Sequence, residues 1–223
     1  MNGAIGDVLP LALGVAISPI PVIAAILMLL SPKAKVTGTG FLLGWVLGIV
    51  VAVTVFTLLS STLPDESGDQ SQPVKGVIQL ILGALLVVMA AGQWRKRPRE
   101  GQEPVMPKWM RAIDTVSFPV ALGLGFLLSA VNPKNLIMAV GAGTAIGGAG
   151  LDGGGTTVVI VVYTLVAAST VLVPVVGYLL AADRLRGPLD DLHGWLAKEN
   201  AVIMAVLLLT IGVTMLGKGI GSF

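Results

Sequence analysis

Lys134 lies near the middle of an apolar stretch that runs from about residue 118 to residue 146. Placing an ammonium group at that depth in a membrane costs roughly 2.5–3.5 kcal/mol. The side chain reaches about 6 Å, the rise of some four helical residues, which is too short to bring its charge to either head-group layer. We therefore expect Lys134 to line a path or a pocket within the membrane.

Helix-breaking residues accompany this lysine. Pro133 leaves backbone groups unpaired, which the hydrocarbon region tolerates only where protein or a water-filled cavity covers them. A second break is expected in the first apolar stretch, where the sequence Ser-Pro-Ile-Pro occupies 18–21. The candidate substrate-binding residues are the breaks and the polar side chains beside them: Ser18, Pro19, Pro21, Ser129, Asn132, Pro133, Lys134 and Asn135.

The chemistry open to Lys134 takes three forms. The ammonium could meet an anionic group of a substrate, such as phosphate or sulfate, as a point charge. It could itself carry a coupling proton, or it could donate to carbonyls freed by Pro21 or Pro133 and be structural. Other polar residues could line the same cavity or form hydrogen bonds between helices: Gln79, Gln93, Tyr163, Thr164, Ser169 and Thr170.

Acidic residues and nucleophile–base pairs are missing from the interior of the apolar stretches. No Asp or Glu falls in the interior of any of them, which disfavours an exporter of metals or cationic amino acids. The chain has no cysteine, and its one histidine, His193, falls between two stretches. Because no nucleophile–base pair is present, neither an enzyme nor a bound cofactor is expected.

The elements that must position these residues are membrane helices. Hydrophobic residues make up 55% of the 223-residue chain and charged residues 12%, and the mean hydropathy is +0.92. Six stretches are long enough to span a bilayer: 8–30, 38–59, 74–94, 118–147, 156–182 and 200–220. The fold class is therefore all-α, a polytopic protein with one transmembrane domain over 1–223. The first stretch is too long for a cleaved signal peptide.

Basic residues set the expected orientation in the plasma membrane. Eleven of the fourteen Lys and Arg residues fall in three stretches, 31–37, 95–117 and 183–199. Because basic loops stay in the cytoplasm, both termini are expected outside. The cluster at 95–99 is then a topology anchor that faces anionic membrane lipid, and no nucleic-acid partner is expected.

An internal repeat relates the two breaks. Residues 11–18 match residues 122–129 at an offset of 111, with four identities in eight positions, and a break follows each copy. The chain then divides into a first repeat at 1–94, a basic cytoplasmic linker at 95–117 and a second repeat at 118–223. Each repeat has three spans, an odd number, so the two are inverted relative to each other. Inverted repeats with broken first helices are typical of secondary transporters, which bind substrate at the repeat interface.

The turns at the two predicted breaks resemble motifs of a known transporter family. Ser-Pro-Ile-Pro at 18–21 and Asn-Pro-Lys at 132–134 resemble the paired motifs of the lysine-exporter superfamily of six-span transporters. The long basic linker and Ser-Ala-Val-Asn-Pro-Lys-Asn at 129–135 resemble its GAP family, the peptidoglycolipid- or sulfolipid-addressing proteins of mycobacteria. The resemblance implies a role in moving glycolipids or their precursors to the cell envelope. Amino-acid exporters carry a Pro-Gly-Pro-Asn type of turn where this chain has Pro-Ile-Pro-Val, which disfavours amino-acid export.

Three functions remain open at this stage. The favoured one is a transporter or flippase of an anionic or glycosylated lipid, or of a lipid-linked precursor. The alternatives are an accessory membrane protein that supports a larger lipid exporter or synthase, and an exporter of a small polar solute or amino acid. The small-residue stripe Gly40, Gly44 and Gly48 predicts close helix packing, within the chain or in a homodimer. The glycine-rich run at 141–155 predicts a flexible hinge.

Overall fold

The computed structural model describes residues 1–61, 73–97 and 116–222, so most of the predicted linker at 95–117 lies outside the described residues. Within the described ranges the chain is helical and contains no strand. Its helices are α1 (Asn2–Ala16), α2 (Pro19–Leu30), α3 (Ala34–Ser61), α4 (Pro73–Arg95), α5 (Phe118–Ala130), α6 (Pro133–Gly147) and α7 (Gly153–Ile220). The predicted all-α class is confirmed.

The helices account for four to six membrane spans. Four segments are long and apolar enough to cross a bilayer by themselves: Ala34–Ser61, Gly76–Arg95, Gly153–Ala182 and Arg184–Ile220. The pairs α1–α2 and α5–α6 pass the same test together, and they are bent by 53° and 60° at their breaks. If each bent pair is one span, the total equals the six stretches expected from hydropathy. The chain is a membrane protein.

Both predicted helix breaks are present, and each has a proline just after it. Ser18 is extended and precedes α2, which begins at Pro19. Asn132 is also extended and caps α6, which begins at Pro133. The first position of a helix suits proline, because the amide that proline lacks would have no partner inside the helix. The prolines therefore start the second helix of each pair and do not kink a continuous one.

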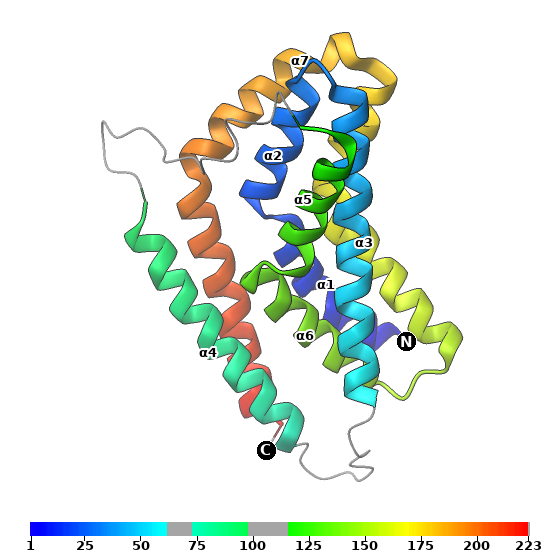
Figure 1. Ribbon diagram of the computed structural model, residues 1–223. Coiled ribbons are helices and arrows are strands. Elements are labelled where there is room, and N and C mark those ends of the chain that lie inside the picture. Colours follow the sequence, from blue (N-terminus) through cyan, green and yellow to red (C-terminus); the bar gives the residue numbers. More distant parts are fainter. Residues whose placement is uncertain (62–72, 98–115, 223) are drawn as a thin grey trace.

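Helix α7 contains two spans joined by a bend. We call Gly153–Ala182 its first arm and Arg184–Ile220 its second arm. Ala181 has non-helical angles, φ −148° and ψ 52°, at the junction. The bend reverses the chain at the end of the bundle opposite the two termini, as Figure 1 shows.

The stretch at 183–199, expected as a loop, is helical. Leu185, Leu189 and Leu196 fall on one side of a helix, and Leu189 and Leu196 are buried. Because such spacing gives the segment an apolar face that can pack on the bundle, it forms an amphipathic helix continuous with the last span.

Glycines bring α3 and α5 into direct backbone contact. A Cβ atom added to Gly44 would lie 1.9 Å from the Leu122 carbonyl oxygen, and one added to Gly125 would lie 2.2 Å from that of Phe41. The stripe of Gly40, Gly44 and Gly48 therefore packs within the chain, which decides between its two predicted uses.

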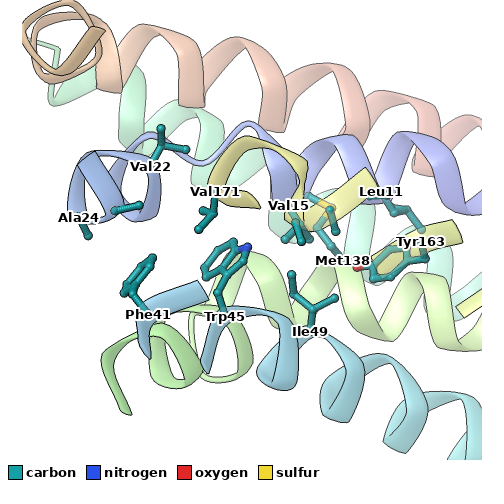
Figure 2. Packing of buried hydrophobic residues seen from close by; sticks show 14 of the residues in the cluster. Leu11, Val15, Val22, Ala24, Phe41, Trp45, Ile49, Met138, Tyr163 and Val171 are labelled. Atoms are coloured by element: carbon teal, nitrogen blue, oxygen red, sulfur yellow. The ribbon is translucent and has the colours of Figure 1, made fainter. Parts of the chain in front are cut away.

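The core lies between α3, the broken pairs and the first arm of α7. Phe41 and Trp45 stack with ring centroids 6.3 Å apart. In Figure 2 these rings and Ile49 of α3 face Val15 of α1 and Val171 of α7. Helix α4 packs along the second arm of α7 (Figure 1), and buried side chains of both, among them Leu86 and Leu208, extend the core in that direction. The two broken pairs are thus held between α3 and α7.

The predicted glycine hinge is shorter than expected. Gly141 and Gly143 lie inside α6, where added Cβ atoms would meet Leu11 of α1 at 3.2 Å and Phe56 of α3 at 2.6 Å. What connects α6 to α7 is a short turn, in which Gly150 has a φ of 60°. The Asp152 side chain then caps α7.

Candidate functional site

The end of α1 leaves one backbone carbonyl without its usual donor. In a continuous helix the amide of Ser18 would donate to Gly14, four residues earlier. Here the Ser18 amide donates to the carbonyl of Ala16 over 2.8 Å. The side chain of Lys134 takes the vacated acceptor, since its Nζ donates to the Gly14 carbonyl oxygen over 2.5 Å. A lysine of the second half therefore caps the break of the first half.

Electrostatics favours this placement of the ammonium group. Lys134 is the second residue of α6, and the first turn of a helix carries partial positive charge. The last turn of α1 carries partial negative charge and attracts a cation. Only 2% of the Lys134 surface is exposed. In this conformation the ammonium group contacts the end of α1, although an open path beside it was expected. Of the three roles considered for Lys134, this contact fits the structural one.

The same break has a second tie from a distant residue. Thr170, on the first arm of α7, donates its Oγ1 hydrogen to the Ala16 carbonyl over 2.6 Å. That carbonyl also accepts from the Ser18 amide, so it has two donors. The end of α1 is thus held by α6 and by α7.

The side-chain hydrogen bonds at the break between α5 and α6 are local, and the buried Asn135 Oδ1 has no hydrogen-bond partner. The Asn135 side-chain amide donates to the Leu128 carbonyl over 2.9 Å, and the Asn132 side chain accepts from the Lys134 backbone amide over 3.1 Å. The Ser129 hydroxyl lies 3.0 Å from carbonyls of its own helix. These hydrogen bonds stay within α5 and α6, while Ser129 packs against Gly48 of α3.

An apolar pocket lies beside the first break. Its volume is about 460 Å³, within the range of about 300–1,000 Å³ found for ligand sites. We call it the break pocket. Ile17, Ser18 and Pro19 form one wall, and residues from both arms of α7 form the others, among them Ser169, Thr170, Trp195 and Ile203.

A second apolar pocket continues along α1. This middle pocket has a volume of about 540 Å³ and lies between α1 and the second arm of α7. It shares Ile17 and Ile203 with the break pocket. Leu13 and Val206, which line it, have about half of their surface exposed. Both pockets are therefore open along the side of the bundle, where hydrocarbon would surround the protein.

A small polar pocket follows at the end of the bundle that holds the termini. This terminal pocket has a volume of about 30 Å³ and shares Pro10 and Ile211 with the middle pocket. Lys218 of α7 forms an ion pair with Asp7 of α1 there, and Gln79 of α4 lines the same space. The three pockets together form a continuous series along α1, which we call the α1 groove.

The structure divides the sequence-predicted site residues between two places. Ser18 and Pro19 line the break pocket. The others lie outside the three pockets of the α1 groove: Pro21, Ser129, Asn132, Pro133, Lys134 and Asn135. Among these, Lys134, Asn135 and Ser129 are buried. Lys134 contacts the end of α1 through the Gly14 carbonyl.

Sequence reasoning pointed to some wall residues and missed others. Ser169 and Thr170, for which cavity lining and interhelical hydrogen bonds were both open, line the break pocket, and Thr170 also forms an interhelical hydrogen bond to Ala16. Trp195 and the Asp7–Lys218 pair were not placed in a site. The signal for Trp195 was its position on the amphipathic stretch, but no pattern in the sequence shows which span that stretch covers. Among the described residues, no group of acidic, His or Cys side chains could hold a metal ion.

The comparisons with known proteins identify a family. The search of curated proteins found no match, and neither did the search of solved structures. A family model described as Sap, sulfolipid-1-addressing protein, matches residues 8–221, which takes in both helix breaks and all the residues that line the break and middle pockets. The chain therefore belongs to the sulfolipid-1-addressing protein family.

Proposed function

We propose that the protein is a transporter or flippase, which moves a lipid or a lipid-linked precursor across the plasma membrane toward the cell envelope. The observation that carries the proposal is the α1 groove. It runs along a broken helix, is apolar over most of its length and opens to the side of the bundle. A lipid needs such a lateral opening to enter from the bilayer, whereas a small polar solute needs only an aqueous path. The family points in the same direction.

The orientation of the groove follows from the basic residues. The turn between α2 and α3 and the bend of α7 lie at the end of the bundle opposite the termini (Figure 1). Lys33 falls in that turn, and Arg184 and Arg186 follow the bend in the sequence. We place this end in the cytoplasm. The break pocket then opens toward the cytoplasmic half of the membrane, and the Asp7–Lys218 pair closes the outer end. The conformation is one in which lipid enters from the cytoplasmic side.

The repeat organisation is part of the same proposal. We assign α1–α2, α3 and α4 to a first three-span unit over 1–94. The pair α5–α6 and the two arms of α7 form the second unit, over 118–223. Equivalent breaks in the first span of each unit support this division, as does the odd number of spans. This organisation into two three-span repeats would also place the family within the lysine-exporter superfamily.

In this mechanism Lys134 positions the groove wall. Its bond to Gly14 ties the end of α1 to α6, and the wall of the middle pocket is built on α1. If α6 moves relative to α3 during transport, the end of α1 moves with it. The lysine thereby couples the second broken pair to the lipid path without touching the lipid in this conformation.

Reconstitution tests the proposed function. Purified protein in liposomes should move a fluorescent glycolipid between leaflets, as measured by the fraction that a membrane-impermeant quencher reaches. Protein-free liposomes and liposomes with heat-denatured protein are the controls. If the intact protein moved no lipid alone but raised the rate of a co-reconstituted lipid exporter, it would be an accessory protein instead.

A further inference from the structure

The indole of Trp45 holds an unpaired hydrogen-bond donor in the core. The side chain is fully buried, and its Nε1 has no hydrogen-bond partner among the described residues. A buried indole N–H usually finds an acceptor, because leaving such a donor unpaired is costly. The hydrocarbon around the protein supplies no acceptor either. A shift that brought a backbone carbonyl to this nitrogen would therefore be favourable.

Trp45 itself is held in place. Its ring stacks on that of Phe41, with 11° between the two planes. Its backbone lies against α5, since a Cβ atom added to Gly125 would be 2.8 Å from the Trp45 amide nitrogen. Because both the ring and the helix that carries it are fixed, an acceptor has to approach the indole.

The end of α1 offers a second carbonyl without a donor. In a continuous helix the Val15 carbonyl would accept from the amide of residue 19, but Pro19 has no N–H. The neighbouring carbonyls of Gly14 and Ala16 accept hydrogen bonds from side chains of other helices. No donor in the described part of the chain bonds the Val15 carbonyl.

The unpaired donor and this acceptor face the same part of the core. In Figure 2 the indole nitrogen of Trp45 is on the side of the ring that faces Val15 and Val171. The Thr170 carbonyl also lacks its helical donor, because Pro174 is inside α7. That carbonyl belongs to a 30-residue span packed on α3, whereas the end of α1 borders an open pocket. The Val15 carbonyl is therefore the one that can move to the indole.

We propose that Trp45 is a positioning residue for transport, whose Nε1 donates to the Val15 carbonyl in a second conformation and holds the end of α1 there. Lys134 ties that end to α6, so a shift of α6 relative to α3 would carry it to the indole. This inference rests on the proposed function for its effect on transport. The hydrogen bond pairs two unpaired groups at once and so gives α1 a defined second position.

Trp45→Phe tests the role, because it keeps an aromatic ring on Phe41 and removes the N–H. Since that donor is unpaired in the structure, the stability of the variant to heating in detergent should equal or exceed that of the parent. Lipid movement per folded molecule should fall about fivefold, which corresponds to about 1 kcal/mol for one hydrogen bond. Trp94→Phe, at a tryptophan that is 48% exposed, is the matched control and should move lipid at the parental rate.

Ultraviolet resonance Raman spectra report whether an indole N–H is hydrogen-bonded. The difference between the spectra of the parent and of Trp45→Phe isolates Trp45. In phosphatidylcholine nanodiscs its N–H should be free, and a bonded component should appear when galactosylceramide sulfate, a sulfated glycolipid, is added. Asp7→Cys and Lys218→Cys joined by a bifunctional thiol reagent fix α1 on α7, in a chain without other cysteines. The joined protein should keep the N–H free.

A further variant identifies the acceptor. Pro174→Ala gives the Thr170 carbonyl an amide donor of its own and should leave the response of Trp45 to the glycolipid unchanged. Loss of that response would assign the acceptor to Thr170 and overturn the role of Val15. A bonded N–H without added glycolipid would also overturn the inference, since a buried water would then be its partner.

The remaining outcomes separate this inference from the proposed function. If the glycolipid produced the bonded component but liposomes showed no lipid movement, the contact between Trp45 and Val15 would stand and the transporter would fall. If lipid moved while the N–H stayed free, or if Trp45→Phe transported at the parental rate, the transporter would stand and the role of Trp45 would fall. A loss of stability in Trp45→Phe would show that the N–H is already paired, which also contradicts the inference.

Discussion

The two helix breaks use similar residues but find their hydrogen-bond partners in different places. At the break between α5 and α6, Asn135 and Asn132 satisfy backbone groups of their own pair. At the break between α1 and α2, the partners are Lys134 and Thr170, which lie more than a hundred residues away in the sequence. The side-chain hydrogen bonds of the first break are local, although the buried Asn135 Oδ1 has no hydrogen-bond partner, whereas those of the second break depend on the positions of other helices.

The two helix breaks also differ in how closely the neighbouring helices pack around them. Helix α5 lies backbone to backbone on α3, with Gly44 and Gly125 at the contact. Helix α1 faces an open groove on one side. A turn held locally against a close-packed helix is a scaffold, whereas a turn held by distant side chains beside a groove can respond when those helices shift. A break in a membrane helix therefore indicates function only once its partners are known.

The largest expected effect comes from the scaffold contact. Gly44→Ala would place a methyl group 1.9 Å from the Leu122 carbonyl oxygen, which is backbone and cannot rotate away. We expect a loss of about 3 kcal/mol in stability. The readout is the fraction of monodisperse protein after heating in detergent. Gly123→Ala, which meets nothing within 4 Å, is the control, and equal stability of the two variants would contradict the close packing.

The second effect falls on transport. Lys134→Met removes the tie to Gly14. It leaves a carbonyl unpaired at a cost of about 1–3 kcal/mol, but it also removes a buried charge that costs roughly 2.5–3.5 kcal/mol. Folded yield should therefore stay near that of the parent, while lipid movement per folded molecule falls at least about tenfold.

Replacing Lys134 by a neutral hydrogen-bond donor distinguishes between its three possible roles: cap of α1, partner of a substrate charge and proton carrier. Lys134→Gln carries an N–H but no charge, so it should recover part of the activity if the role is to cap α1. No recovery would favour substrate charge or proton transfer. Folded yield and liposome transport are measured for both variants side by side.

The third effect should be purely structural. Asn135→Leu keeps the volume of the side chain but removes the donor to Leu128. Stability should fall by about 1–2 kcal/mol, the cost of an unpaired buried carbonyl. Lipid movement per folded molecule should not change. A transport defect as large as that of Lys134→Met would remove the distinction between the two breaks.

The smallest effect concerns the outer end of the groove. The side chains of Lys218 and Asp7 are 42% and 43% exposed, so solvent screens their attraction. A double-mutant cycle with Lys218→Gln and Asp7→Asn should give a coupling of about 0–1 kcal/mol that shrinks at high salt. The neutral variants should raise the rate of outward lipid release if the pair closes the groove. An unchanged release rate would leave the pair as a surface contact.

Much of the fold could be predicted from the sequence because it depends on local pattern. The length of the apolar stretches placed the spans, and the prolines at 19 and 133 placed the breaks. The segment at 183–199 was expected as a loop because its charges stand out in a count of basic residues. The helical spacing of its leucines is present in the sequence and would have indicated an amphipathic helix, but the surface that buries Leu189 and Leu196 is known only from the structure.

The sequence by itself determined that this chain lies in a membrane, that two of its spans are broken and that one buried cation needs a partner. Only the tertiary structure decided that the partner is the Gly14 carbonyl, that Thr170 supports the same helix end and that the groove runs along α1. The physical reason is the range of each effect. Hydrophobic length and proline chemistry act within one segment, whereas the donor for a freed carbonyl and the walls of a groove come from whichever helices pack beside it.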